Sequence, residues 1–146
     1  MTNNIGKFIV AVGAIIEHPT EKKILLLKRS GTADFIPSVW EYISGRMNQF
    51  ETPENGLRRE IREEAGIEVD IVKLMSTFHL FRGKEKSAEN ELVGIVYLCR
   101  ALSDNIIISN EHTEYEWTSA EEALKRISNP GMQKDLHSYI QFQSLL

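Results

Sequence analysis

Residues 45–67 read GRMNQFETPENGLRREIREEAGI and hold the clearest helix signal in the chain. Thr52 is a suitable N-cap, and Pro53 fits the first helical position, where its missing N–H costs nothing. Gly66 suits a left-handed cap at the C-terminal end. The stretch therefore predicts a helix over Pro53–Ala65 with a loop on either side.

One face of this helix carries three carboxylates. On a wheel of about 100° per residue, Glu63 and Glu64 fall within about 60° of Glu60. A separate apolar stripe is available to pack on a sheet: Leu57, Ile61 and Ala65. Like charges at these spacings repel by a few tenths of a kcal/mol per pair, and the helix dipole disfavours them near the C-terminal end. A divalent cation such as Mg²⁺ would answer the repulsion, whereas the alternative is a solvated acidic face paired with neighbouring arginines.

The surrounding residues decide between these two interpretations, because they resemble the Nudix box. That pattern is Gly, five residues, Glu, seven residues, and then Arg-Glu-apolar-any-Glu-Glu-any-Gly-apolar. The matching positions are Gly45, Glu51, Arg59, Glu60, Ile61, Glu63, Glu64, Gly66 and Ile67. Average residue frequencies give a chance match on the order of one in a billion per starting position. The chain is therefore similar to the MutT-like members of the Nudix hydrolases, which cut diphosphate bonds.

The resemblance implies a mixed α/β fold. We expect a Nudix-type α/β/α sandwich with a mixed β-sheet between helices, and a loop–helix–loop that carries catalysis. It also implies that three glutamates bind the metal ions, Mg²⁺ or Mn²⁺: Glu60, Glu63 and Glu64. The backbone carbonyl of Gly45 is expected to join them. Arg59 and Glu51 then orient the carboxylates, with a plain surface ion pair as the alternative.

A second acidic segment, EHTEYEW, ends at Trp117 and is similar to the acidic loop and Trp strand that follow many Nudix boxes. Glu111 takes the position of a further metal ligand or general base. Glu114 and a purely structural loop are the alternatives. For His112 we expect a structural role.

Three further residues are candidates for substrate binding. Arg29 ends the run Leu25–Arg29, which is similar to the Nudix strand that often ends in a basic residue near the nucleotide. A plain surface charge is the alternative. Trp40 and Tyr42 are candidates for a wall beside the base, with buried core aromatics as the alternative.

The loop before the helix departs from the family pattern. Ile43 and Ser44 replace the usual Pro-Gly, and Asn48 and Phe50 replace an acidic and a small residue. Loss of a glycine constrains the backbone. Because the metal-binding positions are kept, the departures put the substrate in doubt and leave the catalytic chemistry in place.

The function that follows is Mg²⁺-dependent hydrolysis of a diphosphate bond in a nucleoside triphosphate or related nucleotide, releasing a nucleoside monophosphate. A metal-activated water attacks one phosphorus in line, and Glu111 or a box glutamate accepts its proton. A nucleoside diphosphate sugar is the second candidate substrate. A non-catalytic nucleotide-sensing module is the alternative from another class, although it would not need the complete carboxylate set.

The chain has 146 residues, the usual size of one domain, and no linker or repeat divides residues 1–146. With 17 basic and 21 acidic side chains its net charge is -4, which predicts no binding surface for nucleic acid polymers or membranes. The lone Cys99 suits a cytoplasmic protein and a place in the core. A homodimer is left open on the resemblance alone.

Apolar runs between turn signals predict the other elements. The expected strands are Phe8–Ile16, Lys23–Lys28, Trp40–Ile43, Val69–Phe81, Glu91–Ala101 and Tyr115–Thr118, and the expected later helices are Ser119–Ile127 and Met132–Phe142.

Overall fold

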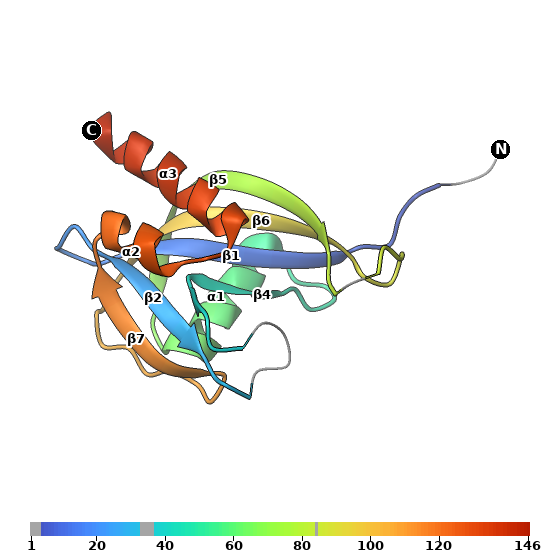
Figure 1. The fold of residues 1–146 in the computed structure, drawn as a ribbon, viewed down its shortest axis with the longest axis horizontal. Coiled ribbons are helices and arrows are strands. Elements are labelled where there is room, and N and C mark those ends of the chain that lie inside the picture. Colours follow the sequence, from blue (N-terminus) through green and yellow to red (C-terminus); the bar gives the residue numbers. More distant parts are fainter. Residues whose placement is uncertain (1–3, 33–36, 84) are drawn as a thin grey trace.

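The computed structural model describes residues 4–32, 37–83 and 85–146. Its strands are β1 (Ile9–Glu17), β2 (Ile24–Arg29), β3 (Trp40–Glu41), β4 (Ile43–Arg46), β5 (Val69–Phe81), β6 (Glu91–Ala101) and β7 (His112–Thr118). Its helices are α1 (Pro53–Ala65), α2 (Ala120–Arg126) and α3 (Pro130–Ser144). Figure 1 shows α1 on one side of the sheet and α2 with α3 on the other, so the expected α/β/α sandwich is confirmed.

The sheet is mixed. Its main path runs β3-β2-β1-β6-β5, with β4 added on β1 and β7 on β2. Strands β1 and β6 are parallel along the whole of β1, whereas the other pairs are antiparallel. Between β1 and β2 the register holds only at Glu17 and Ile24. The two strands therefore separate beyond their turn, and β4 takes the place beside β1.

Side chains that alternate along each strand fill two cores. In β2, Leu25 and Leu27 enter the core beneath α1, together with Leu57 and Ile61 of that helix. Ile24 and Leu26 face the core beneath α2 and α3. Full burial of such a side chain contributes about 1.5–3 kcal/mol to stability. Packing in the two cores therefore holds the helices against both faces of the sheet.

Both ends of α1 form as the sequence predicts. The Thr52 hydroxyl accepts a hydrogen bond from the Asn55 N–H at 3.2 Å. Gly66 adopts a left-handed conformation, with φ of 68°, and its N–H donates to the carbonyls of Ile61 and Arg62. The predicted bounds of α1 are confirmed.

Other predicted elements differ at their ends. The run Trp40–Ile43 is divided into β3 and β4, and β4 continues to Arg46 because it pairs with β1. Strand β7 begins earlier than predicted, at His112, which pairs with Arg29. Helix α3 begins at Pro130, because Asn129 caps it by accepting from the Met132 N–H at 3.1 Å.

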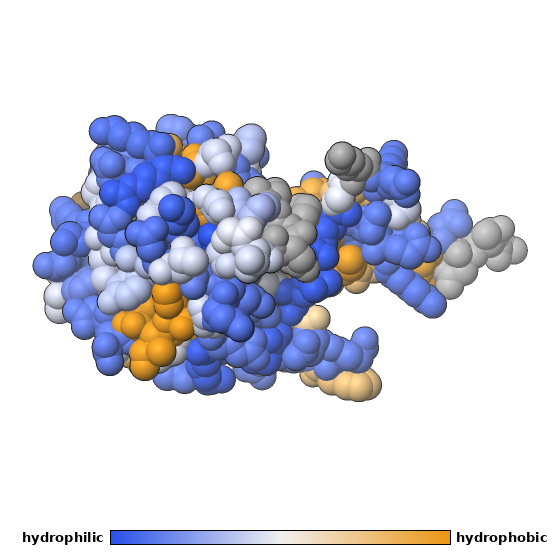
Figure 2. Space-filling model, turned by 60° about the horizontal axis from the view of Figure 1, so that its bottom comes forward, coloured by the Kyte–Doolittle hydropathy of each residue, from blue (hydrophilic) through white to orange (hydrophobic). Residues whose placement is uncertain are grey.

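One face of the molecule shows the polarity of its surface. The face in Figure 2 is largely hydrophilic and carries small apolar patches. Within residues 4–32, 37–83 and 85–146, no helix has both the length and the apolar composition needed to span a bilayer.

Candidate active site

Strand β4 brings Gly45 directly against the acidic face of α1. Opposed residues of an antiparallel pair share a face, and Gly45 lies opposite Val12, whose side chain belongs to the core beneath α1. A Cβ atom built on Gly45 would lie 2.1 Å from the carboxyl carbon of Glu60. Only glycine permits this approach, so the structure brings together two of the residues predicted to bind metal.

The guanidinium of Arg59 links the carboxylates of this site. Its Nε and Nη2 donate to the two oxygens of Glu51 at 2.6 and 3.0 Å. Its Nη1 donates to Glu60 at 3.0 Å and to Glu63 at 3.2 Å. The hydrogen bond from Arg59 is the main reason why the pKa of Glu51 lies below its usual value. Such a two-pronged Arg–carboxylate pair has a fixed geometry, which is what an orienting pair requires.

The loop before α1 closes on the same carboxylate. Glu51 Oε1 also accepts from the Asn48 N–H at 2.6 Å. Between these two residues Phe50 adopts φ of 70° and is 97% exposed. The departure at Phe50 therefore places a large side chain in the left-handed region that favours glycine. Ser44 is accommodated differently, since it lies in β4 beside Gly13, which has no side chain.

Glu64 is the most unusual carboxylate of α1. It is 6% exposed, and its Oε2 is buried without a hydrogen-bond partner among the residues that the structure describes. Burial raises its pKa to about 9, and the charges of Glu60, Glu41 and Glu111 add to the rise, whereas Arg29 opposes it. A buried carboxylate without a partner is costly, so this oxygen is available to a cation.

Glu60 shares part of this environment. Burial raises its pKa, the hydrogen bond from Arg59 opposes the rise, and the charges of Glu63 and Glu111 add to it. Glu111 itself is exposed. The structure thus places Glu111 within electrostatic reach of both Glu60 and Glu64, as its predicted role requires. Glu114 instead pairs with Lys28 at 3.4 Å.

The donor set fits a hard divalent cation, which prefers carboxylate and carbonyl oxygens. In the described part of the chain, no three acidic, histidine or cysteine side chains already stand close enough together to enclose an ion. Arg59 holds one oxygen of Glu60 and one of Glu63. Two observations support a cation site here. Glu64 has an oxygen without a partner among the described residues, and Gly45 leaves room for the Glu60 carboxylate.

Sequence reasoning missed Glu41. This side chain is buried, and its Oε2 lies 3.3 Å from Arg29 Nη1 and 2.9 Å from His112 Nε2. A charged residue between Trp40 and Tyr42, in a strand-like run, was the available signal. Along a strand, Trp40 and Tyr42 point to one side and Glu41 to the other. Because helices cover both faces of this sheet, Glu41 is buried as well.

The two aromatic candidates lie in the core on the other face. Tyr42 is buried beneath α2 and α3, and its hydroxyl donates to Asp135 at 2.5 Å. Trp40 packs against the same core, and the guanidinium carbon of Arg126 lies 5.4 Å from its ring centre. These contacts are those of core aromatics, the alternative to a wall beside the base. A role for either side chain in substrate binding stays a prediction.

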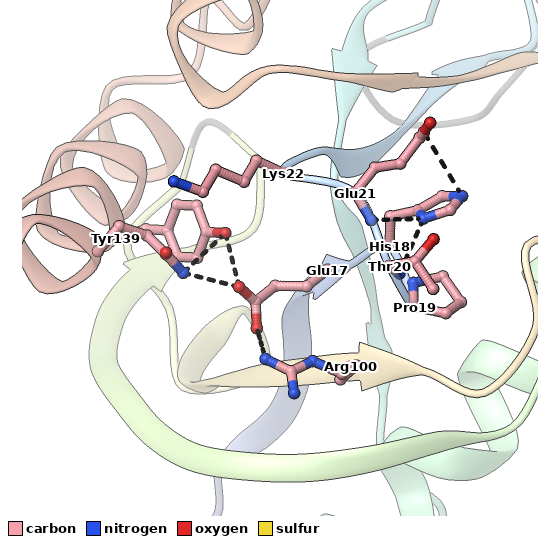
Figure 3. A pocket seen from close by; sticks show the side chains of 9 residues that line it. Glu17, His18, Pro19, Thr20, Glu21, Lys22, Arg100 and Tyr139 are labelled. Atoms are coloured by element: carbon pink, nitrogen blue, oxygen red, sulfur yellow. Dashed lines mark hydrogen bonds and ion pairs between the residues drawn. The ribbon is translucent and has the colours of Figure 1, made fainter. Parts of the chain in front are cut away.

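A cavity of about 290 Å³ lies apart from all the predicted residues, where β1, β6 and α3 meet. Figure 3 shows Glu17 within it, with Tyr139 and Arg100 directed at its two oxygens. Glu17 accepts from the Tyr139 hydroxyl at 2.9 Å and from Arg100 at 3.4 Å. The carboxylate of Glu17 in this cavity is thus already paired.

Comparison with known proteins gives consistent matches. The NUDIX domain model matches residues 7–138. A CTP pyrophosphohydrolase of Escherichia coli (strain K12) is 31% identical over 123 residues, which are 82% of each chain. A MutT-like protein of Streptomyces ambofaciens is 29% identical over 89 residues, covering 61% of this chain but only 53% of that protein. The crystal structure of a MutT protein from Methanosarcina mazei Go1 shares the fold, with a TM-score of 0.76, 24% identity, and coverage of 94% and 96% of the two chains.

Proposed function

Since the chain belongs to the NUDIX domain family, we propose that it hydrolyses a diphosphate bond in a nucleoside triphosphate or related nucleotide. Water and the triphosphate would give a nucleoside monophosphate and pyrophosphate. The observation that supports this most directly is the buried oxygen of Glu64, which has no partner among the described residues and lies within electrostatic reach of Glu60. The relative named CTP pyrophosphohydrolase also supports a triphosphate substrate.

Divalent metal ions are part of the proposal. The residues that would hold Mg²⁺ or Mn²⁺ are the three glutamates of α1 and the carbonyl of Gly45: Glu60, Glu63 and Glu64. When bound, the ion would supply a more acidic water and neutralise phosphate charge. Arg59, itself fixed by two hydrogen bonds to Glu51, would keep the Glu60 and Glu63 carboxylates oriented.

Proton transfer falls to an acidic group beside this cluster. Glu111 is exposed, and its charge acts on both Glu60 and Glu64. Both observations support Glu111 as the group that would accept a proton from the attacking water. One of the box glutamates is the alternative acceptor.

Arg29 is the proposed contact to the substrate phosphates. Its charge opposes the rise in the pKa of Glu64, and Arg29 follows Leu25 and Leu27 on the face of β2 that α1 covers. A planar guanidinium matches the geometry of phosphate oxygens better than an ammonium group does. Arg29 would bind and orient the phosphate chain next to the acidic face.

The test is a substrate screen with the purified protein and Mg²⁺. Nucleoside triphosphates, oxidised nucleotides, nucleotide sugars and dinucleotides are compared by the phosphate released after coupled phosphatases. We expect a triphosphate to be preferred, and turnover to disappear with EDTA and in Glu64→Gln. The matched control is Arg62→Gln, since Arg62 lies on α1 but pairs with Glu68, away from the cluster. Full activity of Glu64→Gln, or folded protein that hydrolyses nothing in the panel, would overturn the proposal.

A further inference from the structure

Strand register brings three polar side chains to one place beneath α1. Leu25 and Leu27 face the core under that helix, so Arg29, two residues further along β2, points to the same side. Glu41 lies opposite Leu27, and His112 lies opposite Arg29. Opposed residues share a face, so Arg29, Glu41 and His112 converge where the apolar core ends.

A single carboxylate oxygen holds the other two groups. Glu41 Oε2 accepts from Arg29 Nη1 at 3.3 Å and lies 2.9 Å from His112 Nε2. The His112 side chain is completely buried, and the side chains of Glu41 and Arg29 are 10% and 20% exposed. Charge-assisted hydrogen bonds in so little water are strong and directional.

The contact also fixes the state of the imidazole. An ionised carboxylate only accepts hydrogen bonds, so His112 Nε2 must carry the proton that faces Glu41. The other ring nitrogen, Nδ1, is buried and makes no hydrogen bond within the described residues. The ring is therefore anchored through Glu41, and its own effect is to fix the direction of that carboxylate.

This group lies on the face of the sheet that α1 covers. The charges of Glu41 and Arg29 act on Glu64 with opposite signs. We propose that Glu41, braced by His112, is a positioning residue that holds the Arg29 guanidinium on the face of the sheet beneath α1, where it meets the substrate phosphates. The inference rests on the proposed function for the identity of the bound group, and adds how the binding group is held.

A double-mutant cycle tests the assignment, because a residue that acts only through another loses its effect when that other residue is gone. Arg29→Ala and Glu41→Ala should each lower kcat/KM on the order of 10- to 100-fold. The double variant should be no worse than Arg29→Ala alone. Glu41→Gln, which keeps an acceptor oxygen, should recover part of the loss. Losses that multiply in the double variant, or an unaffected Glu41→Ala, would overturn the proposal.

The matched control is Glu116→Ala. It breaks a part-buried carboxylate–guanidinium pair with Arg126 that also involves β7, but on the face beneath α2. We expect wild-type kcat/KM for this variant even if its melting temperature falls. An equal loss of kcat/KM in the control would mean that general weakening of β7, and not positioning, explains the Glu41 variant.

Two readouts do not depend on turnover. The same cycle is measured on the Kd for inorganic pyrophosphate, so it decides the role of Glu41 even if the wild type hydrolyses nothing and the proposed function fails. Nitrogen-15 NMR should show the His112 proton on Nε2 in the wild type and a changed His112 signal in Glu41→Ala. A neutral ring with its proton on Nδ1 and none on Nε2 in the wild type would contradict the arrangement.

Discussion

Two buried carboxylates, Asp135 on one face of the sheet and Glu64 on the other, lie in opposite environments. Beneath α2 and α3, Asp135 accepts from the hydroxyls of Tyr42 and Ser76 at 2.5 and 2.6 Å. Beneath α1, Glu64 has a buried oxygen with no partner and acidic neighbours that raise its pKa. Buried polar groups in proteins are normally satisfied. The face that breaks this rule is the one that carries the proposed chemistry.

Asp135 and Glu64 differ in whether other groups of the chain satisfy them, and this difference separates a structural carboxylate from a functional one. A satisfied carboxylate such as Asp135 joins α3 to the sheet and lowers the energy of the fold alone. An unsatisfied one such as Glu64 costs stability until something outside the chain answers it, which is the pattern expected of a functional site. Substitutions on the two faces should therefore affect stability and activity in opposite proportions.

The largest effect on stability is expected from Asp135→Ala. The change leaves the buried hydroxyl of Tyr42 and the part-buried hydroxyl of Ser76 without their acceptor, and loss of a buried partner costs about 1–3 kcal/mol. We expect the free energy of unfolding to fall by about 3 kcal/mol in urea titrations, with kcat/KM unchanged where the protein remains folded. A stable variant with lost turnover would abolish the distinction between the faces.

The second prediction concerns how stability depends on pH, which should reflect Glu64 beneath α1. The pKa of Glu64 is raised from 4.5 to about 9 in the folded, metal-free protein, so the folded state binds more protons than the unfolded state between these values. Stability must then fall as pH rises through that window. Urea titrations without metal should show this fall in the wild type and a smaller one in Glu64→Gln. Identical pH profiles for the two proteins would show that Glu64 is not the group whose ionisation lowers stability.

The sequence predicted α1 and its acidic face because those signals are local. Thr52, Pro53 and Gly66 mark the helix ends, and the spacing of the glutamates defines one side of it. Of strand β4 only Ile43 was predicted, because residues 44–46 contain no large apolar side chain, and they form a strand because they pair with β1.

The role of Glu41 was missed for a related reason. Its meeting with Arg29 and His112 depends on two registers between strands that are far apart in the chain. Residue patterns along a single strand predict which side chains share a face, but they do not specify which residues of another strand lie opposite. Contacts set by pairing became visible only in the folded structure.

The smallest change in stability is expected from substitutions of Phe50, in the loop before α1. Phe50 holds φ of 70° with its side chain almost entirely exposed, so it bears strain without compensating burial. Phe50→Gly should raise the free energy of unfolding by about 0.5–1 kcal/mol, because relief of the left-handed backbone exceeds the added flexibility of the unfolded chain. Phe50→Ala is the matched control, since it removes the ring but keeps the strain, and it should show no such gain. If glycine and alanine stabilise equally, exposure of the ring and not the backbone is the cost. If the glycine variant also loses kcat/KM while alanine does not, the strained loop itself helps to hold Glu51 against Arg59.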